Sequence, residues 1–262
     1  MKIWIITMED PLYTLDFIKD IIKVKHEQIV GITITKGGRL KVGKKKSKII
    51  YLFSLLIILG PLNFVKNVFK TLLFKVQKKV SSLFSFIKSP GLEFFANSYN
   101  IIVDFTDNPN NQDYLNKLRK KKLDVIINQS QSILKKPLID IPSIGVLNRH
   151  NALLPKNRGR LTPFWVLYKK EVETGVSIHL VDEGIDSGDI VVQKRIKVTN
   201  DDTFNKLVKK NYEIASDAMI EAIDLIEKGY SDFMYNDDEQ ATYNTLPTFK
   251  QALKYRISFF RR

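Results

Sequence analysis

Short runs of apolar residues, separated by longer stretches, set the strongest limit on what this chain can fold into. Residues 2–7 contain Ile-Trp-Ile-Ile, residues 28–35 contain Val-Gly-Ile-Thr-Ile-Thr, and residues 123–128 read Leu-Asp-Val-Ile-Ile-Asn. Such runs indicate strands that are buried on both faces, as in a parallel sheet. Residues 15–24 lie between the first two runs and repeat apolar side chains at helical spacing. This β-α-β order predicts an α/β fold in which helices flank a mostly parallel sheet.

The same alternation returns further along the chain. We expect strands at residues 100–105, 144–147, 175–181 and 190–198, and helices at residues 110–122, 162–168 and 200–228. No Gly-x-Gly-x-x-Gly follows the first strand, so the usual dinucleotide-binding fingerprint is absent. The chain has no cysteine, and its three histidines are not spaced like zinc ligands. We therefore expect neither disulfides nor a metal site.

Three polar residues have the chemistry to act together. Asn148 and His150 are two residues apart, so in a strand their side chains point to the same face. Asp186 follows a second alternating run, and a neighbouring strand would bring its carboxylate to His150. An amide N–H can stabilise an oxyanion, an imidazole can move a proton near neutral pH, and a carboxylate can fix the imidazole tautomer. No Ser, Cys or Thr is placed to form a covalent intermediate, so the pattern favours acyl transfer by direct attack of an amine.

The residues around these three form a longer ordered pattern. It comprises Asn148-Arg-His150, Leu153-Leu154-Pro155, Arg158-Gly159, Thr174-Gly175-Val176, His179 and Asp186-Ser-Gly188. The stretch from Lys121 to Val198 resembles the formyltransferases that use 10-formyltetrahydrofolate, a family that includes methionyl-tRNA formyltransferase, glycinamide ribonucleotide formyltransferase and the sugar N-formyltransferases. The resemblance implies a Rossmann-like formyltransferase fold, 10-formyltetrahydrofolate as co-substrate, and catalytic roles for Asn148, His150 and Asp186.

The resemblance also implies two loops that hold the pterin ring of the folate. The residues concerned are Gln131, Ser132 and Ile133 in the first loop, and Asp182, Glu183 and Gly184 in the second. From the sequence alone, each loop also reads as an ordinary polar turn.

The chain departs from the family pattern in what would be the pocket wall. Asn151 and Ala152 stand where relatives often carry Gly and Ser, and Asn157 stands where an aromatic residue usually precedes the Arg-Gly pair. These departures bear on the acceptor rather than on the three catalytic candidates. Arginines in the segment 158–160 either meet a phosphate or carboxylate, or are solvated. His179 has no visible chemical partner, so we expect it to be structural.

The net charge of +14 is concentrated in one segment. Residues 36–88 contain no Asp or Glu, whereas the remainder of the chain is nearly neutral. The basic residues of the segment are Lys36, Arg39, Lys41, Lys44, Lys45, Lys46, Lys48, Lys66, Lys70, Lys75, Lys78, Lys79 and Lys88. Such a concentration of charge indicates an anionic partner.

Residues 36–90, which contain this basic segment, interrupt the α/β order, and we interpret them as a basic, apolar helical insertion. Their Gly37-Gly38 pair is a weak signal of phosphate binding, and their uncharged stretch, residues 49–65, is broken by Gly60-Pro61. Beyond the break, apolar side chains and lysines recur on separate helical faces, as in helices that lie on membranes. We expect the basic segment to bind an anionic membrane surface; a packed or oligomerising insertion and a true membrane span are alternatives. Nucleic acid is less favoured, because long apolar runs do not suit a surface that follows phosphates.

The predicted organisation is a catalytic domain of residues 1–35 and 91–200, the insertion at 36–90, and a C-terminal helix and tail at 201–262. The tail contains Thr-Tyr-Asn-Thr-Leu-Pro-Thr, and sugar N-formyltransferases commonly carry a similar Tyr…Leu-Pro-Thr string. Too few residues follow Val198 for a helix plus the tRNA-holding domain usual in methionyl-tRNA enzymes. We therefore expect formylation of an amino sugar, nucleotide- or lipid-linked, for a surface polysaccharide such as the O-antigen of lipopolysaccharide.

Other functions stay open at this point. They are formylation of methionyl-tRNA or another amine, hydrolysis of formyltetrahydrofolate by a deformylase, and folate binding by a non-catalytic, membrane-bound adaptor. The intact Asn-His-Asp set argues against the adaptor. We expect a cytoplasmic protein, peripheral on the inner face of the cell membrane, and a homodimer is an open alternative to a monomer.

Overall fold

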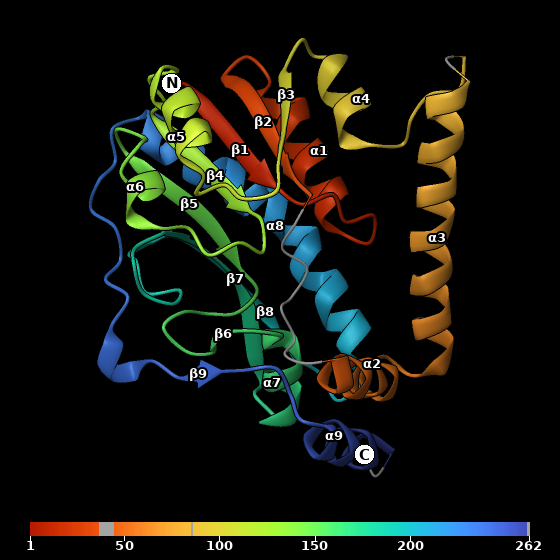
Figure 1. Ribbon diagram of the computed structural model, residues 1–262. Helices are drawn as coiled ribbons and strands as arrows, with labels where there is room; N and C mark the ends of the chain where they lie inside the picture. The colour runs from red at the N-terminus through yellow and green to blue at the C-terminus, as the bar shows by residue number, and fades with distance from the viewer. Residues whose placement is uncertain (37–44, 85, 261–262) are drawn as a thin grey trace.

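A seven-stranded sheet forms the centre of the molecule. The structure is a computed structural model that describes residues 1–36, 45–84 and 86–260. The strand order is β3-β2-β1-β4-β5-β7-β8 (Figure 1). The strands are β1 (Ile3–Thr7), β2 (Ile29–Thr35), β3 (Ile102–Thr106), β4 (Val125–Gln129), β5 (Gly145–His150), β7 (Glu173–Leu180) and β8 (Ile190–Lys197), with β6 (Arg158–Gly159) and β9 (Tyr243–Asn244) forming a separate ribbon. The first five strands in this order, β3, β2, β1, β4 and β5, are parallel to one another. Strand β7 runs antiparallel to β5 and to β8. The predicted α/β fold with a mostly parallel sheet is confirmed.

Helices cover both faces of this sheet. They are α1 (Thr14–Lys25), α4 (Leu92–Asn97), α5 (Gln112–Arg119), α6 (Lys136–Ile139), α7 (Thr162–Tyr168), α8 (Phe204–Glu227) and α9 (Phe249–Phe260), with a short 3-10 turn η1 (Asp238–Gln240). Helices α1, α4 and α8 bury Ile18, Ala96 and Met219 in one cluster, while α5 and α6 bury Leu118 and Leu138 in another. Because helices cover the sheet on both sides, β1 and β4 are buried at every position.

The crossover from β2 to β3 carries two further helices, α2 (Lys45–Leu59) and α3 (Pro61–Leu83). They meet at Gly60, whose φ of +78° lies in the left-handed region that favours glycine, and Pro61 opens α3. The two helices are bent by 115° at this point, so the predicted break at Gly60-Pro61 is confirmed. Figure 1 shows α3 as a column along one side of the molecule, apart from the sheet.

Two of our sequence expectations concern this crossover. The Gly37-Gly38 pair lies outside the described residues. Within the part of the chain that the structure describes, no single helix has the length and apolar character needed to cross a membrane, although α2 and α3 meet that criterion together as a bent pair.

The C-terminal helix packs beside α2. Helices α2, α7, α9 and the start of α8 form a third cluster that buries Ile58, Phe164, Phe204 and Tyr255. Just before α9, strand β9 pairs in parallel with β6. The tail therefore contacts both the basic segment, through α2, and the loop that contains β6.

Candidate active site

Two of the predicted residues lie at the C-terminal end of β5. Asn148 and His150 alternate with Arg149, so their side chains share one face of the strand. Strand β5 pairs in parallel with β4 and antiparallel with β7, and Asn148 lies opposite Asn128 of β4 and His179 of β7. Both neighbouring strands can therefore bring polar side chains to the end of β5.

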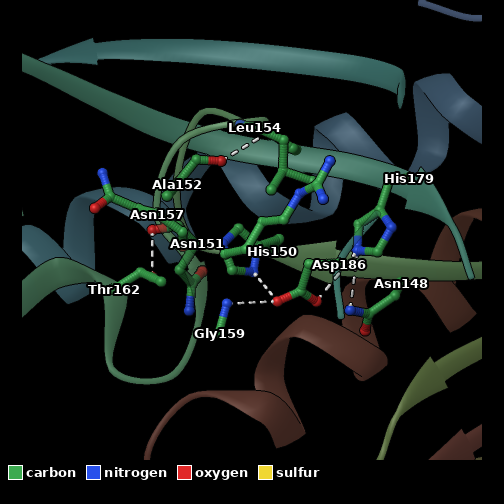
Figure 2. Close-up of polar contacts among 12 residues, drawn as sticks. Asn148, His150, Asn151, Ala152, Leu154, Asn157, Gly159, Thr162, His179 and Asp186 are labelled. Carbon is green, nitrogen blue, oxygen red and sulfur yellow. Dashed lines mark hydrogen bonds and ion pairs between the residues drawn. The ribbon is translucent and has the colours of Figure 1, made fainter. Parts of the chain in front are cut away.

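Asp186 reaches the same place from the loop between β7 and β8. Its φ of +50° is a left-handed conformation, which is uncommon for a residue other than glycine. In Figure 2 its carboxylate lies between two histidines: Oδ2 is 3.4 Å from His150 Nδ1, and Oδ1 is 3.6 Å from His179 Nε2. Oδ2 also accepts a 2.8 Å hydrogen bond from the Gly159 N–H. The structure thus joins Asp186 directly to His150, and to Asn148 through His179.

The loop before α7 holds several residues in the left-handed region. Asn157, Gly159 and Leu161 have φ values of +59°, +101° and +54°. A β-carbon at position 159 would lie 2.1 Å from the backbone oxygen of Asn244 in β9, so only glycine fits. This close approach directs the Gly159 N–H at Asp186. Left-handed conformations cost about 1 kcal/mol or more outside glycine, and they cluster at functional sites.

His150 is 5% exposed, and both of its ring nitrogens face polar atoms. Nε2 lies 2.8 Å from the carbonyl oxygen of Asn157, and because a carbonyl only accepts, Nε2 carries the proton. In the neutral ring, Nδ1 then has a free lone pair that faces Asp186. Burial lowers the pKa of His150 below its ordinary value, and Asp186 opposes that shift. His150 is therefore neutral near pH 7 and can accept a proton on Nδ1, beside a carboxylate that stabilises the charged ring.

Asp186 stays ionised although it is largely buried. Burial by itself raises the pKa of a carboxyl group, but His150 and the hydrogen bond from the Gly159 N–H hold the pKa of Asp186 well below its usual range. The side chain is thus a fixed negative charge that only accepts hydrogen bonds.

The amide of Asn148 is held in one orientation. Its Oδ1 accepts a 3.2 Å hydrogen bond from Gln129 Nε2, and its Nδ2 lies 3.2 Å from His179 Nε2. His179 Nδ1 is 2.6 Å from the carbonyl oxygen of Leu180 and so carries the ring proton, which makes Nε2 the acceptor for Asn148. These contacts use one N–H of the Asn148 amide and leave its second N–H for a substrate oxygen.

His179 therefore has a closer connection to the site than the sequence indicated. We expected a structural role because no chemical partner was visible, whereas the structure places it against Asn148 and Asp186. The available signal was the Ser177-x-His179 alternation, which on an antiparallel neighbour sets Ser177 opposite His150 and His179 opposite Asn148.

A second set of residues holds the amide of Asn148 in place, and sequence reasoning did not identify it. Arg149 stacks 4.1 Å from the ring centre of Tyr212 and donates to the Tyr212 hydroxyl at 2.8 Å. It also donates from Nε to Gln129 Oε1 at 2.9 Å, which leaves the Gln129 amide nitrogen to hold Asn148. No pattern in the sequence connects residues on β4, β5 and α8, so this chain of contacts only becomes visible in the fold.

A cavity of about 560 Å³ opens beside these residues, and Asn148, His150 and Asp186 all line it. Its other walls come from the loop after β1, the loop after β4, α8, and the helices α2 and α3, which contribute Tyr51 and Asn67 among others. A volume of this size suits a small-molecule site. One cavity thus contains an oriented amide donor, a neutral buried imidazole and an ionised carboxylate.

Of the two loops expected to hold the pterin ring, the first contributes a residue to the wall of this cavity, and the three predicted residues of the second are not among the lining residues. Gln131 lines it, whereas Ile133 is 80% exposed and the Ser132 N–H donates to Ser130 Oγ. In the second loop, the residues form a compact turn in which Asp182 accepts hydrogen bonds from the Gly184 N–H and the Ser187 hydroxyl, and Glu183 is exposed. Folate contacts at these six positions, Gln131, Ser132, Ile133, Asp182, Glu183 and Gly184, remain predictions.

The two arginines of the segment 158–160 have separate roles. Arg158 is fully buried and bonded to Asp238, Asn236 and Tyr243, so it is a structural residue rather than a ligand for phosphate. Arg160 is exposed and lines the cavity. Of the two, Arg160 is the one available to a bound anion.

The chain matches the profile of the formyl transferase family over residues 83–223. It is 36% identical over 149 residues to methionyl-tRNA formyltransferase of Kosmotoga olearia, covering 56% of this chain and 48% of that protein. It is 30% identical over 150 residues to methionyl-tRNA formyltransferase of Fusobacterium nucleatum, covering 57% of this chain and 48% of that protein. The chain thus spans about half the length of the curated relatives that it matches.

Solved structures agree on the fold. Glycinamide ribonucleotide transformylase 1 of Symbiobacterium toebii superposes with a TM-score of 0.58 at 14% identity, covering 87% of this chain and 88% of that one. The N-formyltransferase of Helicobacter canadensis, solved with folinic acid and dTDP-3-aminofucose, superposes with a TM-score of 0.60 at 16% identity, covering 99% and 81%. These likenesses confirm the formyltransferase fold, and the profile match covers more than half of the sequence. The chain belongs to the formyl transferase family.

Proposed function

We propose that this protein transfers the formyl group of 10-formyltetrahydrofolate to the amine of an amino sugar. The observation that carries the proposal is the single cavity in which the spare N–H of Asn148 faces the same space as the His150–Asp186 pair. This set matches what acyl transfer to an amine requires, namely a donor for the oxyanion and a base for the proton.

The residues present fit a folate formyl donor. The amide of Asn148 has one hydrogen-bond donor left over after its fixed contacts, and the cavity is large enough for a small molecule. Gln131 and Asn148 line one connected space, so a ligand held by the loop after β4 would also reach the catalytic residues. 10-Formyltetrahydrofolate supplies a formyl group bonded to an amine nitrogen that can leave.

The proposed reaction gives each of the three residues a separate role. Asn148 donates its free N–H to the formyl oxygen as negative charge develops there. His150 accepts the proton of the attacking amine at Nδ1, and Asp186 stabilises the imidazolium that results. The new bond joins the acceptor nitrogen to the formyl carbon. The bond from that carbon to the folate nitrogen breaks, and this nitrogen takes the proton from His150.

An amino-sugar acceptor is supported by the tail of the chain and by the cavity wall. Strand β9 of the Thr-Tyr-Asn-Thr-Leu-Pro-Thr stretch pairs with β6, and Leu246 of the same stretch lines the cavity. Tyr13, Tyr51 and Tyr212 also line it, and aromatic rings of this kind pack well against sugar rings. The product would enter a surface polysaccharide.

Methionyl-tRNA is the second candidate acceptor, because the curated relatives that the chain matches are methionyl-tRNA formyltransferases. The test is release of tetrahydrofolate from 10-formyltetrahydrofolate with methionyl-tRNA, with nucleotide-linked 3-amino and 4-amino sugars, or with no amine. Release that requires an amino sugar supports the proposal. Release with methionyl-tRNA alone contradicts it, and equal release without any amine indicates a deformylase.

We further propose that the protein acts in the cytoplasm as a peripheral protein on the inner face of the cell membrane. The support is the basic segment, residues 36–88, which contains thirteen Lys and Arg and no acidic residue. Flotation with anionic vesicles at low salt tests this, and recovery of all the protein in the unbound fraction would contradict it.

A further inference from the structure

The outer face of α3 is apolar and exposed. Successive residues of a helix are turned by about 100°, which places every third or fourth side chain of α3 on one stripe. The stripe consists of Leu62, Val65, Phe69, Leu72, Leu73 and Val76, and these side chains are between 43% and 86% exposed. None of the residues in α3 is buried. An ordinary amphipathic helix turns such a stripe toward the core, so α3 is arranged the opposite way.

The inner face of α3 fixes this orientation. Lys78 forms an ion pair with Glu9, the ammonium of Lys70 lies 3.4 Å from the carbonyl oxygen of Leu12, and Phe74 packs against the main core. Asn67, on the same side, lines the active-site cavity. These contacts hold the helix against the loop after β1, and the apolar stripe, which is exposed, points away from the body of the molecule.

The charge of the segment favours one kind of partner for this stripe. Lys66, Lys75 and Lys79 are exposed on α3 beside the stripe, and residues 36–88 contain thirteen basic residues and no acidic one. A second copy of the chain placed on this face would bring two strongly positive segments together, at an electrostatic cost. An anionic lipid surface instead offers apolar chains to the stripe and negative headgroups to its lysines.

Helix α2 connects this surface to the active site. One side of α2, formed by Tyr51, Leu55 and Leu59, lines the cavity. Another side, which includes Ile50 and Phe53, is more than half exposed and apolar. The helix is therefore a thin wall with the reaction space on one side and an exposed apolar surface on the other, so an acyl or prenyl chain that leaves the cavity meets apolar side chains.

Arg160 adds a site for a phosphate at this wall. It lines the cavity, and it lies close enough to Tyr51 of α2 to oppose the rise in the pKa of that hydroxyl that burial causes. A guanidinium in this place can hold a phosphate of the acceptor.

We propose that the amine acceptor is an amino sugar joined through phosphate to a membrane lipid, and that the outer stripe of α3 lies on the anionic membrane that holds it. This inference rests on the proposed formyl transfer and narrows its acceptor. The covalent step is unchanged: the sugar nitrogen gains the bond to the formyl carbon, and the folate nitrogen loses it.

The first experiment compares two forms of one amino sugar as acceptor. One form is linked through phosphate to a polyprenol in vesicles of mixed phosphatidylcholine and phosphatidylglycerol, and the other is the soluble nucleotide diphosphate. Formylated product is measured by mass spectrometry. We expect kcat/KM to be about tenfold or more higher for the vesicle-bound form, because the surface concentrates enzyme and acceptor together. Equal or faster transfer to the soluble nucleotide form overturns the inference and leaves formyl transfer intact. No transfer to either form, nor to any other amine, overturns the proposed function itself.

The second experiment breaks the apolar stripe. The double substitution Phe69→Glu and Leu72→Glu should reduce vesicle binding about a hundredfold, since two large apolar side chains no longer enter the membrane. Gln77→Glu with Ser82→Glu is the matched control, because it changes the charge of α3 equally at exposed positions off the stripe. The ratio of transfer on vesicle-bound acceptor to transfer on the same acceptor in detergent should fall only in the first variant. A similar loss in both variants, or a dimer in lipid-free sedimentation that only the first variant loses, contradicts a membrane at this face.

Discussion

The C-terminal end of β5 and the outer face of α3 are built in opposite ways. Around the end of β5, polar side chains are largely enclosed and form hydrogen bonds or ion pairs with residues of several elements. Asn148, His150 and Asp186 each contact at least two partners. On the outer face of α3, the apolar side chains of the stripe are exposed and belong to none of the hydrophobic clusters of the described residues.

This difference shows which kind of binding partner each region needs. A buried polar network that is satisfied internally is preorganised, so it stabilises developing charge without rearranging. An exposed apolar stripe is the reverse case, because its free energy falls only when something covers it. The buried region is already ordered for catalysis, and the outer face of α3 is the surface for which we propose a membrane partner.

The strongest test of the buried region is Asp186→Asn. Asparagine tolerates the left-handed φ of +50° and can still accept from Gly159, so the fold should persist. It cannot stabilise the charged His150 ring as a carboxylate does. We expect kcat to fall by about a thousandfold to ten-thousandfold, as in other sites where a carboxylate supports an imidazole. Rates are measured as tetrahydrofolate release, and the melting temperature serves as the control. A loss below about tenfold would show that the carboxylate does not support the base.

Asn148→Ala tests the oxyanion donor. Its second N–H is the donor that we assign to the formyl oxygen, so kcat should fall by about a hundredfold to a thousandfold. Binding of the folate, followed by fluorescence, should be nearly unchanged. If the KM of the donor rises and kcat stays the same, Asn148 binds the ground state and not the transition state.

His179→Leu tests whether the orientation of Asn148 matters. Leucine keeps the volume but removes the acceptor for Asn148 Nδ2, and we expect kcat to fall about tenfold, the scale of a lost supporting contact. His179→Gln offers an oxygen in its place and should recover part of the loss, which a purely structural role would not require. Equal activity in all three proteins would remove His179 from the network.

The ionisation of His150 can be followed directly by NMR. Burial should place its pKa below the ordinary value of 6.5 in the folded protein. Because Asp186 raises this pKa, Asp186→Asn should lower it further. The signal is assigned among the three histidines by its loss in His150→Ala. A pKa above 6.5 in the wild-type protein would mean that the carboxylate of Asp186 outweighs the effect of burial on His150.

The sequence predicted the buried region well because local rules decide it. Apolar runs located the strands, and the alternation along β5 placed Asn148 and His150 on one face. The contacts that hold them could not be predicted, since Gln129, Arg149 and Tyr212 come together from three elements only in the fold. For the same reason the sequence left open whether Arg158 meets a ligand, and its partners lie about eighty residues away in the tail.

The outer face of α3 shows a different limit of sequence reasoning. The spacing of Leu62, Val65, Phe69 and Leu72 correctly indicates an amphipathic helix. Periodicity is identical for a stripe that faces the core and one that faces solvent, so it cannot give the direction. Long-range contacts, such as the ion pair between Lys78 and Glu9, set the direction in which the stripe faces. The local spacing of residues cannot predict such contacts.

Gly60→Ala tests the junction between the two regions and should have the smallest effect. At φ +78° alanine is strained, and its β-carbon would lie 3.0 Å from a guanidinium nitrogen of Arg256, so we expect a loss of about 1 kcal/mol in urea unfolding. Gly229→Ala is the matched control, because φ is +80° there and nothing lies within 4 Å. Both variants should lose similar stability, but only Gly60→Ala should raise the KM of the acceptor, since it tilts α2 and with it the cavity wall formed by Tyr51 and Leu55. An unchanged KM in Gly60→Ala would mean that the angle between α2 and α3 is set without Gly60, or that the acceptor does not touch this wall, and it would separate the exposed surface from the catalytic one.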